Sequence, residues 1–428
     1  MTEHRTLYLW SEWFFWHDAG SVSNLLKDKF VQPVPMWEGP EAKRRIHNLL
    51  LTSGLFQENQ KGEEKGKCGE GGRALVARHL TDLHPETDTS ISAVHTEEHV
   101  SLVRRQSFAG GQVGEETVVA ANGYDIARLA VSAVLEAVDS LVKRQFQNAY
   151  ALVRPPGHHA CSDRAMGFCM FNNVAAGVRY FQKVAASGAL KKAHSGEASA
   201  VSKTAGESGE KGEEKTKERV AVVDFDVHHG NGTQEIFWDD PTVLLVSVHQ
   251  ADNYPPRSGR VGEEGGRGAE GTKVNVPLPP GSGSGAYQAV FTRIVLPALR
   301  LFRPSIIFVS CGFDGSYMDP LGKMMLSSED FRWMTAQLVD SASELSEGRL
   351  VVCHEGGYSD IYCPYCGLAT VEALAGLRSA VQDPFLEEVN GWGYQELQKH
   401  QEEVIDATTS GALAKLQKTI GSDELYKR

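Results

Sequence analysis

The sequence predicts an α/β protein with three layers, in which helices cover both faces of a mostly parallel central sheet. Short apolar segments alternate along the chain with longer helical patterns, which is typical of parallel strands joined by crossover helices. Polar residues directly follow these apolar segments. In open α/β sheets ligands bind beyond the carboxyl ends of the strands, so these polar residues are expected to meet at one rim.

Five short apolar runs are expected to form strands, because continuous apolar runs of this length suit strands that are buried on both faces. In chain order they are Asn148–Arg154, Arg219–Asp226, Thr242–His249, Ser305–Asp314 and Leu350–His354. Helical patterns between them include Tyr124–Phe146 and Tyr287–Phe302. The polar residues at the strand ends are His158 and His159, then Asp224, Asp226 and His228, then His249, Asp314, and finally Glu355 with Tyr358. We therefore expect a single site at the carboxyl rim of the sheet.

The whole chain, residues 1–428, is expected to form one domain. Its length is large for a single domain, but α/β folds of this kind can remain single, and 41% hydrophobic residues suffice for a sizeable core. Two stretches with too few apolar residues to pack, 57–72 and 190–218, are expected to be disordered insertions. The stretch Gly259–Thr272 is rich in glycine and charge, and is expected to form a long surface loop near the site.

Composition argues against several classes of protein. A net charge of −12 and a pI of about 5.7 disfavour direct binding to nucleic acid, which needs concentrated positive charge. An acidic surface suits a cationic substrate or a basic protein tail. Seven cysteines do not resemble a secreted disulfide framework, and Cys363 and Cys366 are expected to be buried thiols. Because neither a signal peptide nor a transmembrane stretch is recognisable, we expect a protein of the nucleus or the cytoplasm that does not act at a membrane.

Asp224, Asp226 and His228 alternate along the second predicted strand, so their side chains are expected to project from the same face. Two carboxylates and an imidazole are costly to bury unless a metal or other partners accompany them. Asp226, His228 and Asp314 form a set of three candidate ligands that leaves an open position, as in catalytic zinc sites. The alternative is a buried network of hydrogen-bonded acids and histidines. Asp224 is expected to accept a hydrogen bond from a histidine rather than to ligate the metal.

His158 and His159 are expected to lie in one loop, because Pro155-Pro156-Gly157 ends the preceding strand. One of them is a candidate general acid or base, although two histidines of a surface loop are the alternative. Tyr358 follows Gly356-Gly357, which lets the backbone approach a ligand closely. Its phenol could stabilise a developing oxyanion, or it could be an ordinary half-buried tyrosine.

Several other residues have simpler interpretations. Phe168 could line a narrow apolar channel or belong to the core. Lys43-Arg44-Arg45 is expected to be a solvated helix face. Packed or supporting roles are expected for three further histidines, namely His229, His249 and His354.

Five segments together resemble the histone deacetylase family, nearest to its class II branch. They are Arg154-Pro-Pro-Gly-His-His-Ala160, Gly167-Phe-Cys-Met-Phe-Asn-Asn173, Val223-Asp-Phe-Asp-Val-His-His-Gly-Asn-Gly-Thr-Gln234, Gly312-Phe-Asp314 with Asp319-Pro-Leu-Gly322, and Glu355-Gly-Gly-Tyr358. They follow one another in the order of the family and cover most of Val118–Ala380. The pair Asn231 and Glu355 resembles class II, where class I typically carries Asp and Gly.

The resemblance implies an arginase–deacetylase fold and a zinc-dependent hydrolase that acts on N-ε-acetyl-lysine in proteins, such as histone tails or tubulin. It places one zinc ion on Asp226, His228 and Asp314. It also implies a potassium site in the region of Asp224 and Ser247.

The resemblance further implies that His159 is the general base and acid. His158 is then its electrostatic partner, oriented by Asp224. Asn231 occupies the place where class I carries an acid next to the second histidine, so His159 should be less basic. Tyr358 matches the residue that stabilises the oxyanion.

The substrate tunnel of the family is usually lined by two phenylalanines. Gly167-Phe168 matches one of them, while the place of the other falls on Pro255 with Tyr254 beside it. The tunnel should therefore be shaped differently on that side. In the weaker amino-terminal match, Trp37 belongs to a segment that is loosely similar to a loop of the family, and His17-Asp18 could line the entrance.

Three other functions remain open. An acetylpolyamine deacetylase would share the fold and the metal, but polyamine enzymes place a glutamate where this chain has Leu321. A binuclear manganese ureohydrolase would need more carboxylates than one cluster and Asp314. A catalytically silent module that binds acetyl-lysine is the alternative from another class. The sequence indicates no oligomeric state.

Overall fold

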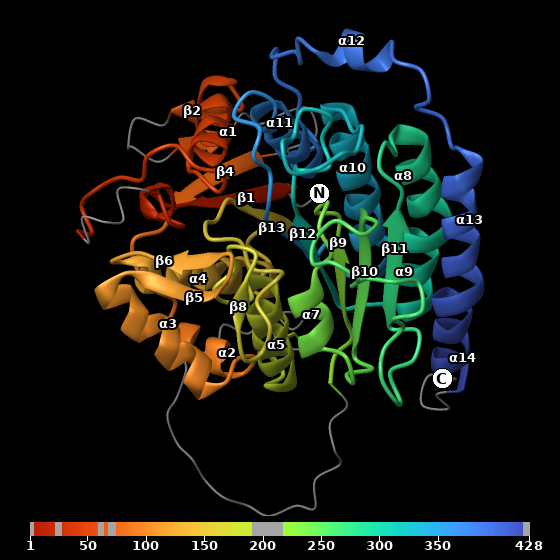
Figure 1. Cartoon of the computed structure of the whole chain (residues 1–428), viewed down its shortest axis with the longest axis horizontal. Helices are drawn as coiled ribbons and strands as arrows, with labels where there is room; N and C mark the ends of the chain where they lie inside the picture. The colour runs from red at the N-terminus through yellow and green to blue at the C-terminus, as the bar shows by residue number, and fades with distance from the viewer. Residues whose placement is uncertain (1–3, 22–27, 59–63, 67–73, 191–216, 423–428) are drawn as a thin grey trace, which may run out of the picture.

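The computed structural model describes residues 4–21, 28–58, 64–66, 74–190 and 217–422. A ten-stranded sheet forms its centre, in the strand order β11-β10-β9-β12-β13-β7-β1-β4-β3-β2 (Figure 1). The eight strands from β11 to β4 are parallel, and the short strands β3 and β2 are antiparallel. The strands are β1 (Arg5–Trp10), β2 (Phe56–Glu58), β3 (Glu64–Gly66), β4 (Ala74–His79), β7 (Asn148–Ala151), β9 (Val220–Asp224), β10 (Val243–Gln250), β11 (Lys273–Leu278), β12 (Ile306–Cys311) and β13 (Leu350–His354).

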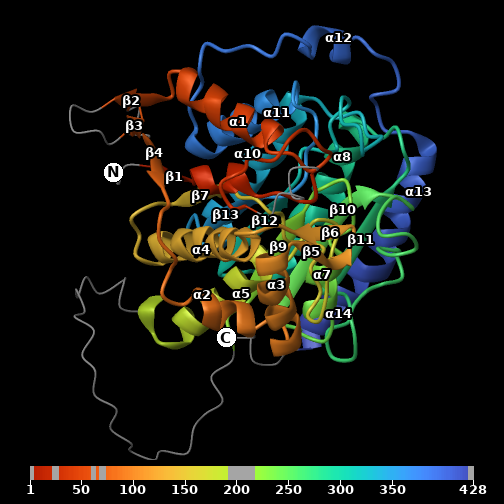
Figure 2. The same cartoon turned by 60° about the vertical axis from the view of Figure 1, so that its left-hand side comes forward.

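Helices cover both faces of this sheet, as predicted for a three-layer α/β/α fold. One layer contains α2 (Thr87–Ser92), α3 (Glu97–Ala109), α4 (Gly123–Val142), α5 (Asn173–Ala186) and α7 (Asn231–Ile236). The other contains α1 (Glu41–Thr52), α8 (Ser284–Val290), α9 (Leu296–Phe302), α10 (Ser328–Leu345), α11 (Cys363–Ala375), α13 (Lys399–Thr408) and α14 (Ala414–Ser422). Figure 2 shows α1 and α4 on opposite sides of β1 and β7.

Alternation along the strands explains the two apolar layers. In β9, Val220 and Val222 belong to the cluster under α4 and α5, whereas Ala221 and Val223 belong to the cluster under α10. All five residues of this strand are buried. A strand that is covered on both faces needs a continuous apolar run, which is the pattern that identified it in the sequence.

The predicted helix Tyr287–Phe302 is a continuous helical segment made of α8, a π-helical turn (Phe291–Val295) and α9. Pro297 lies in the first turn of α9, where its missing N–H cannot complete the regular α-helical ladder. A local π-helical turn accommodates such a break. The helix then ends at Phe302, and the next residue, Arg303, adopts the left-handed conformation.

Three strands end earlier than the sequence pattern suggested. β7 ends at Ala151, β9 at Asp224 and β12 at Cys311. The polar residues that follow these strands therefore lie in loops at the carboxyl rim, where the backbone can turn them toward one another. The rim of the sheet thus carries the site predicted from the strand ends.

The insertion at 57–72 is partly ordered, which corrects the expectation of disorder for those residues. Phe56–Glu58 and Glu64–Gly66 pair as β2 and β3. Residues 59–63 and 67–72 lie outside the described residues, as does 191–216 of the second insertion. Gly259–Thr272 forms a loop without helix or strand, as expected.

The carboxyl-terminal helices extend along the outer edge of the sheet. After α12 (Leu386–Asn390), α13 runs beside β11 (Figure 1). The hydroxyl of Thr408 donates a hydrogen bond of 3.0 Å to the backbone oxygen of Asn275 in β11. Among the described residues, no helix combines the length and apolar character that crossing a membrane requires.

Candidate active site

Asp226, His228 and Asp314 form a compact buried cluster of potential metal ligands. One ligand atom from each residue lies within 4.8 Å of the other two. Nδ1 of His228 lies 3.1 Å from Oδ1 of Asp226 and 3.1 Å from Oδ2 of Asp314. The backbone N–H of Val227 donates to Asp314, and that of Gly356 donates to Asp226, each at 2.8 Å. These bonds hold both carboxylates beside the imidazole.

Two glycines make room for this cluster. A Cβ atom on Gly312 would lie 2.1 Å from Oδ2 of Asp226, and one on Gly356 would lie 2.1 Å from Oδ2 of Asp314. Only a residue without a side chain fits at these positions. The backbone is thus packed directly against the carboxylate oxygens.

The electrostatics of the cluster fit a divalent cation. Burial raises the pKa of Asp314 to about 6, and the charge of Asp226 adds to this effect. Burial opposes a charge on His228, but its bonds to Asp226 and Asp314 raise its pKa to about 10. A proton on His228 thus supplies positive charge between two carboxylates. A metal ion would supply that charge instead and release the proton, and a set of two oxygens and one nitrogen suits zinc.

His158 and His159 lie next to the cluster with their ring centroids 4.0 Å apart. Nδ1 of His158 lies 3.0 Å from Oδ2 of Asp224, so Asp224 pairs with a histidine as expected. Burial opposes a charge on His158, but Asp226 and Asp224 raise its pKa to about 10. Nδ1 of His159 instead lies 2.8 Å from the side-chain oxygen of Asn231.

The two histidines differ in pKa because of the charges around them. Burial and the charge of His158 hold the pKa of His159 well below its usual range. The opposite pKa shifts mean that a proton binds His158 more readily than His159. With Nδ1–H directed at the amide oxygen of Asn231, Nε2 of His159 can accept a proton.

Glu355 holds the loop that carries both histidines. Its Oε2 accepts hydrogen bonds from the backbone N–H of Gly157, at 2.6 Å, and of His158, at 3.2 Å. The resemblance to class II identified Glu355 without assigning it a contact. The structure places it directly beneath the histidine loop.

A cavity of about 550 Å³ opens beside these residues. Its lining consists of Trp37, Glu116, Val118, His159, Gly167, Phe168, His228, Asn253, Tyr254, Leu321 and Tyr358. The rings of Phe168 and Tyr358 lie 6.1 Å apart, and those of His159 and Tyr254 lie 5.0 Å apart. The structure thus brings Phe168, Gly167, Tyr254 and Leu321 to one cavity with His159, His228 and Tyr358.

Three residues that were predicted to lie at the cavity or its entrance are not part of its lining: Pro255, His17 and Asp18. Pro255 is not part of the lining, and the aromatic ring of its neighbour Tyr254 takes that side of the cavity. His17-Asp18 is not at the entrance either, since both side chains are buried. The backbone oxygen of His17 accepts a hydrogen bond from the Arg154 guanidinium, and the carboxylate of Asp18 accepts bonds from Gly20 and Ser21.

Glu116 and Val118 line the cavity although no motif drew attention to them. They come from the turn and second strand of a small sheet formed by β5 (Gly111–Glu115), β6 (Thr117–Val119) and β8 (Ala165–Met166). Glu116 adopts a positive φ of 50° at the turn between β5 and β6. Because hairpin turns are common, this signal could not have been separated from ordinary turn chemistry in the sequence.

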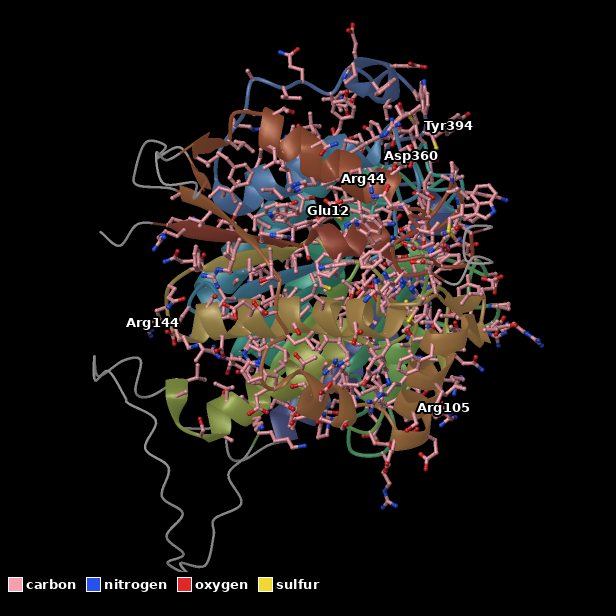
Figure 3. The ribbon with its side chains drawn as sticks, turned by 90° about the vertical axis from the view of Figure 1, so that its left-hand side faces the viewer. Glu12, Arg44, Arg105, Arg144, Asp360 and Tyr394 are labelled. Atoms are coloured by element: carbon pink, nitrogen blue, oxygen red, sulfur yellow. The ribbon has the colours of Figure 1, made fainter. Side chains whose placement is uncertain are left out.

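Lys43 corrects another expectation. The segment Lys43-Arg44-Arg45 was predicted to be solvated, but Lys43 is only 1% exposed. Its Nζ lies over the ring of Tyr358, 4.9 Å from the ring centroid. Figure 3 labels the next residue, Arg44, which in that view lies between Glu12 and Asp360.

Other predicted positions are packed as expected. Cys363 and Cys366 are buried free thiols. His229, His249 and His354 are buried, and Nδ1 of His249 lies 2.9 Å from the hydroxyl of Ser247.

Ser247 pairs with Asp224 in the register of β10 and β9, so the residues named for a potassium site are neighbours. The ion itself stays a prediction.

The chain is similar to several known proteins. The profile of the histone deacetylase domain matches residues 40–191 and 209–374. A histone deacetylase-like amidohydrolase of Pseudomonas aeruginosa is 40% identical over 388 residues, covering 89% of this chain and 88% of that protein. A probable deacetylase of Archaeoglobus fulgidus is 35% identical over 294 residues, covering 68% of this chain and 73% of that protein.

A solved structure, described as the HDA15 HD domain, superimposes with a TM-score of 0.73 at 26% identity and covers 99% of both chains. The fold is therefore the three-layer arginase–deacetylase fold. The matched domain profile, the extent of the two relatives and the rim cluster of Asp226, His228 and Asp314 lead to one conclusion: the chain belongs to the histone deacetylase family.

Proposed function

We propose that this protein is a zinc-dependent hydrolase of class II type that removes acetyl groups from N-ε-acetyl-lysine in proteins. One observation carries the proposal: His228, which belongs to the ligand cluster with Asp226 and Asp314, lines a cavity that His159 and Tyr358 also line. A cavity that places a base and a hydrogen-bond donor beside a metal-ligand cluster suits the hydrolysis of an amide at the end of a long side chain.

The residues divide the reaction among them. Nε2 of His159 takes a proton from the attacking water, because the ring is neutral and its other nitrogen is held by Asn231. The phenol of Tyr358 donates a hydrogen bond to the oxygen that becomes negative. His159 then returns its proton to the departing lysine amine. A zinc ion bound here would supply the Lewis acidity that polarises the acetyl carbonyl and acidifies water.

His158 acts by its charge rather than by proton transfer. The Asp224 carboxylate orients its ring. Its positive charge keeps His159 neutral, and so ready to accept a proton.

Acetylated protein tails are the substrates that we favour. Leu321, rather than an acid, lines the cavity at the position that distinguishes polyamine enzymes. The acidic net charge of −12 also suits basic tails in the nucleus or the cytoplasm. Histones, tubulin or other proteins would fit this description equally.

One observation favours acetylpolyamines as a second candidate substrate class. The carboxylate of Glu116 belongs to the cavity lining and could pair with a second ammonium group. Turnover of an acetyl-lysine peptide and of N-acetylspermidine, measured for the wild type and for Glu116→Gln, separates the two. Lysine specificity predicts that the peptide is the better substrate and keeps most of its turnover in the variant.

The central experiment is an acetyl-lysine peptide assay on the wild type and on Asp314→Ala, with zinc measured for both. We expect about one zinc per wild-type chain, and we expect Asp314→Ala to lose zinc and activity together. Asp360→Ala, which removes an exposed aspartate, is the control. Two manganese ions per chain would support a ureohydrolase, and peptide binding without turnover would support a silent binding module; either result would overturn the proposal.

A further inference from the structure

Lys43 is buried against the proposed oxyanion residue. It extends from α1, and its Nζ donates a hydrogen bond of 3.2 Å to the backbone oxygen of Gly357, the residue before Tyr358. The same Nζ lies 4.9 Å from the centre of the Tyr358 ring. One ammonium group thus contacts both the backbone and the ring of the segment that carries the phenol.

Lys43 is also the end of a buried chain of charges. Its Nζ lies 3.3 Å from Oε1 of Glu38. Both Glu38 oxygens accept hydrogen bonds from the Arg154 guanidinium, at 2.6 to 3.0 Å. Arg154 precedes the loop of His158 and His159. The chain Arg154, Glu38 and Lys43 therefore connects the histidine loop with the tyrosine segment.

Burying these three charges costs free energy of desolvation, which argues against a purely structural role. Lys43, Glu38 and Arg154 are each 0–1% exposed, and buried ion pairs often contribute no more stability than apolar residues of similar size. Here two cations share one carboxylate. Burial opposes ionisation of Glu38, but Arg154 and Lys43 hold its pKa below the usual range, so it stays charged. The ammonium of Lys43 then has the Gly357 oxygen and the Tyr358 ring as its remaining partners.

A cation on the face of an aromatic ring is attracted to the ring, and the attraction is strongest where water is excluded. The positive charge also draws electron density from the phenol oxygen, which makes its O–H a stronger hydrogen-bond donor. Both effects act on the group that must donate to the developing oxyanion.

We propose that Lys43 is a positioning residue for Tyr358, which holds the phenol in place and strengthens it as a donor. The inference rests on the proposed deacetylase function. Lys43 is neither part of the cavity lining nor one of the proposed metal ligands, so we assign its effect on catalysis to Tyr358.

The test is a double-mutant cycle between Lys43→Met and Tyr358→Phe, with an acetyl-lysine peptide and its trifluoroacetyl analogue. Methionine keeps most of the length and apolar volume of lysine but removes the charge. We expect Lys43→Met to lower kcat on the acetyl peptide about 10–30-fold, with KM and zinc content unchanged. In the Tyr358→Phe background the same change should cost less than about 3-fold, because the group through which it acts is gone.

The trifluoroacetyl carbonyl is more electrophilic and needs less help from a donor. The loss in Lys43→Met should therefore shrink on this peptide. Lys43→Arg, which keeps the charge, should recover a large part of the turnover. Arg45→Met changes an exposed cation on the same helix and is the matched control, with no expected effect.

The outcomes separate this inference from the proposed function. Equal losses in both Tyr358 backgrounds and on both peptides, or no loss at all, overturn the role of Lys43 alone. A zinc-loaded wild type that hydrolyses neither peptide overturns the proposed function, and the inference with it. If Lys43→Met unfolds at a lower temperature, the ratio of the two peptide rates still tests the role of Lys43. A general loss of folded protein lowers both rates equally and leaves this ratio unchanged.

Discussion

The side-chain oxygen of Asn231 lies 2.8 Å from Nδ1 of His159, whereas the neighbouring His158 is held by the carboxylate of Asp224 at 3.0 Å. Two adjacent histidines thus have partners of different charge. The pKa of His158 is raised to about 10, and that of His159 lies well below its usual range. The neutral amide leaves His159 a weaker base than an acid in its place would.

Asn231→Asp should therefore raise the pKa of His159. An anion within hydrogen-bond distance stabilises the imidazolium by about 1–3 pKa units. We expect the acid limb of the pH profile of kcat/KM to move to higher pH, since His159 must be neutral to accept a proton. Asn48→Asp, at an exposed position of α1, serves as the control. An unchanged acid limb would argue against His159 as the base.

Tyr358→Phe should lower kcat by about 10²–10³ because one hydrogen bond to the oxyanion is lost. The metal ligands are untouched, so zinc content should equal that of the wild type. Steady-state rates and metal analysis on the same preparation check both points. Wild-type turnover in this variant would show that Tyr358 does not stabilise the oxyanion.

Gly356→Ala should impair metal binding although it changes no ligand. The added Cβ would lie 2.1 Å from Oδ2 of Asp314 and 2.7 Å from Oδ2 of Asp226, so both carboxylates must move. We expect zinc affinity to fall by at least about 10-fold, measured by competition with a chromogenic chelator. Gly393→Ala, where no atom lies within 4 Å of the added Cβ, is the control. Equal zinc affinity in both variants would contradict the close packing at Gly356.

Removal of the metal should lower both activity and stability. A ligand that binds only the folded state stabilises it by about 2.7 kcal/mol at a free concentration of 100 times Kd. We expect chelation to abolish turnover and lower the unfolding temperature, and added zinc to restore both. Asp314→Ala should show no response of its unfolding temperature to zinc. A full zinc response in that variant would place the ion elsewhere.

Lys273 should make the free energy of unfolding depend on pH between neutral and alkaline conditions. Burial lowers its pKa to about 7, while a lysine of the unfolded chain titrates near about 10.4. Between these values the unfolded state binds a proton that the folded state does not, so the contribution of Lys273 to stability rises with pH. The free energy of unfolding, measured with urea at pH 7 and pH 9, should differ between wild type and Lys273→Met by an amount that changes with pH. Lys323→Met, at an exposed lysine, should parallel the wild type.

The ligand set could be predicted because it depends on strand ends. Asp226 and His228 follow β9, and Asp314 follows β12, its neighbour in the sheet. Adjacent parallel strands deliver the residues after their carboxyl ends to the same place, so spacing in the sequence sufficed. The partner of His158 was predictable for the same reason, since Asp224 is the last residue of β9.

Lys43 could not be predicted in this way. Helical periodicity places charged residues on the solvent side of a helix, and Lys43 has charged neighbours at Arg44 and Arg45. Its burial depends on Glu38, Gly357 and Tyr358, which reach it from a preceding loop and from a distant part of the chain. The sequence also could not predict that Tyr254 lines the cavity and Pro255 does not, because this depends on the conformation of their loop.

The hydrogen bond from Thr408 to Asn275 has a consequence for association between molecules. The edge strand of a sheet exposes unpaired backbone groups that can recruit a strand from another chain. Because α13 lies along β11 and satisfies an outward-facing carbonyl, it closes this edge to such recruitment. The carboxyl-terminal helices thus cover the β11 edge of the sheet, where an exposed strand would favour association with another chain.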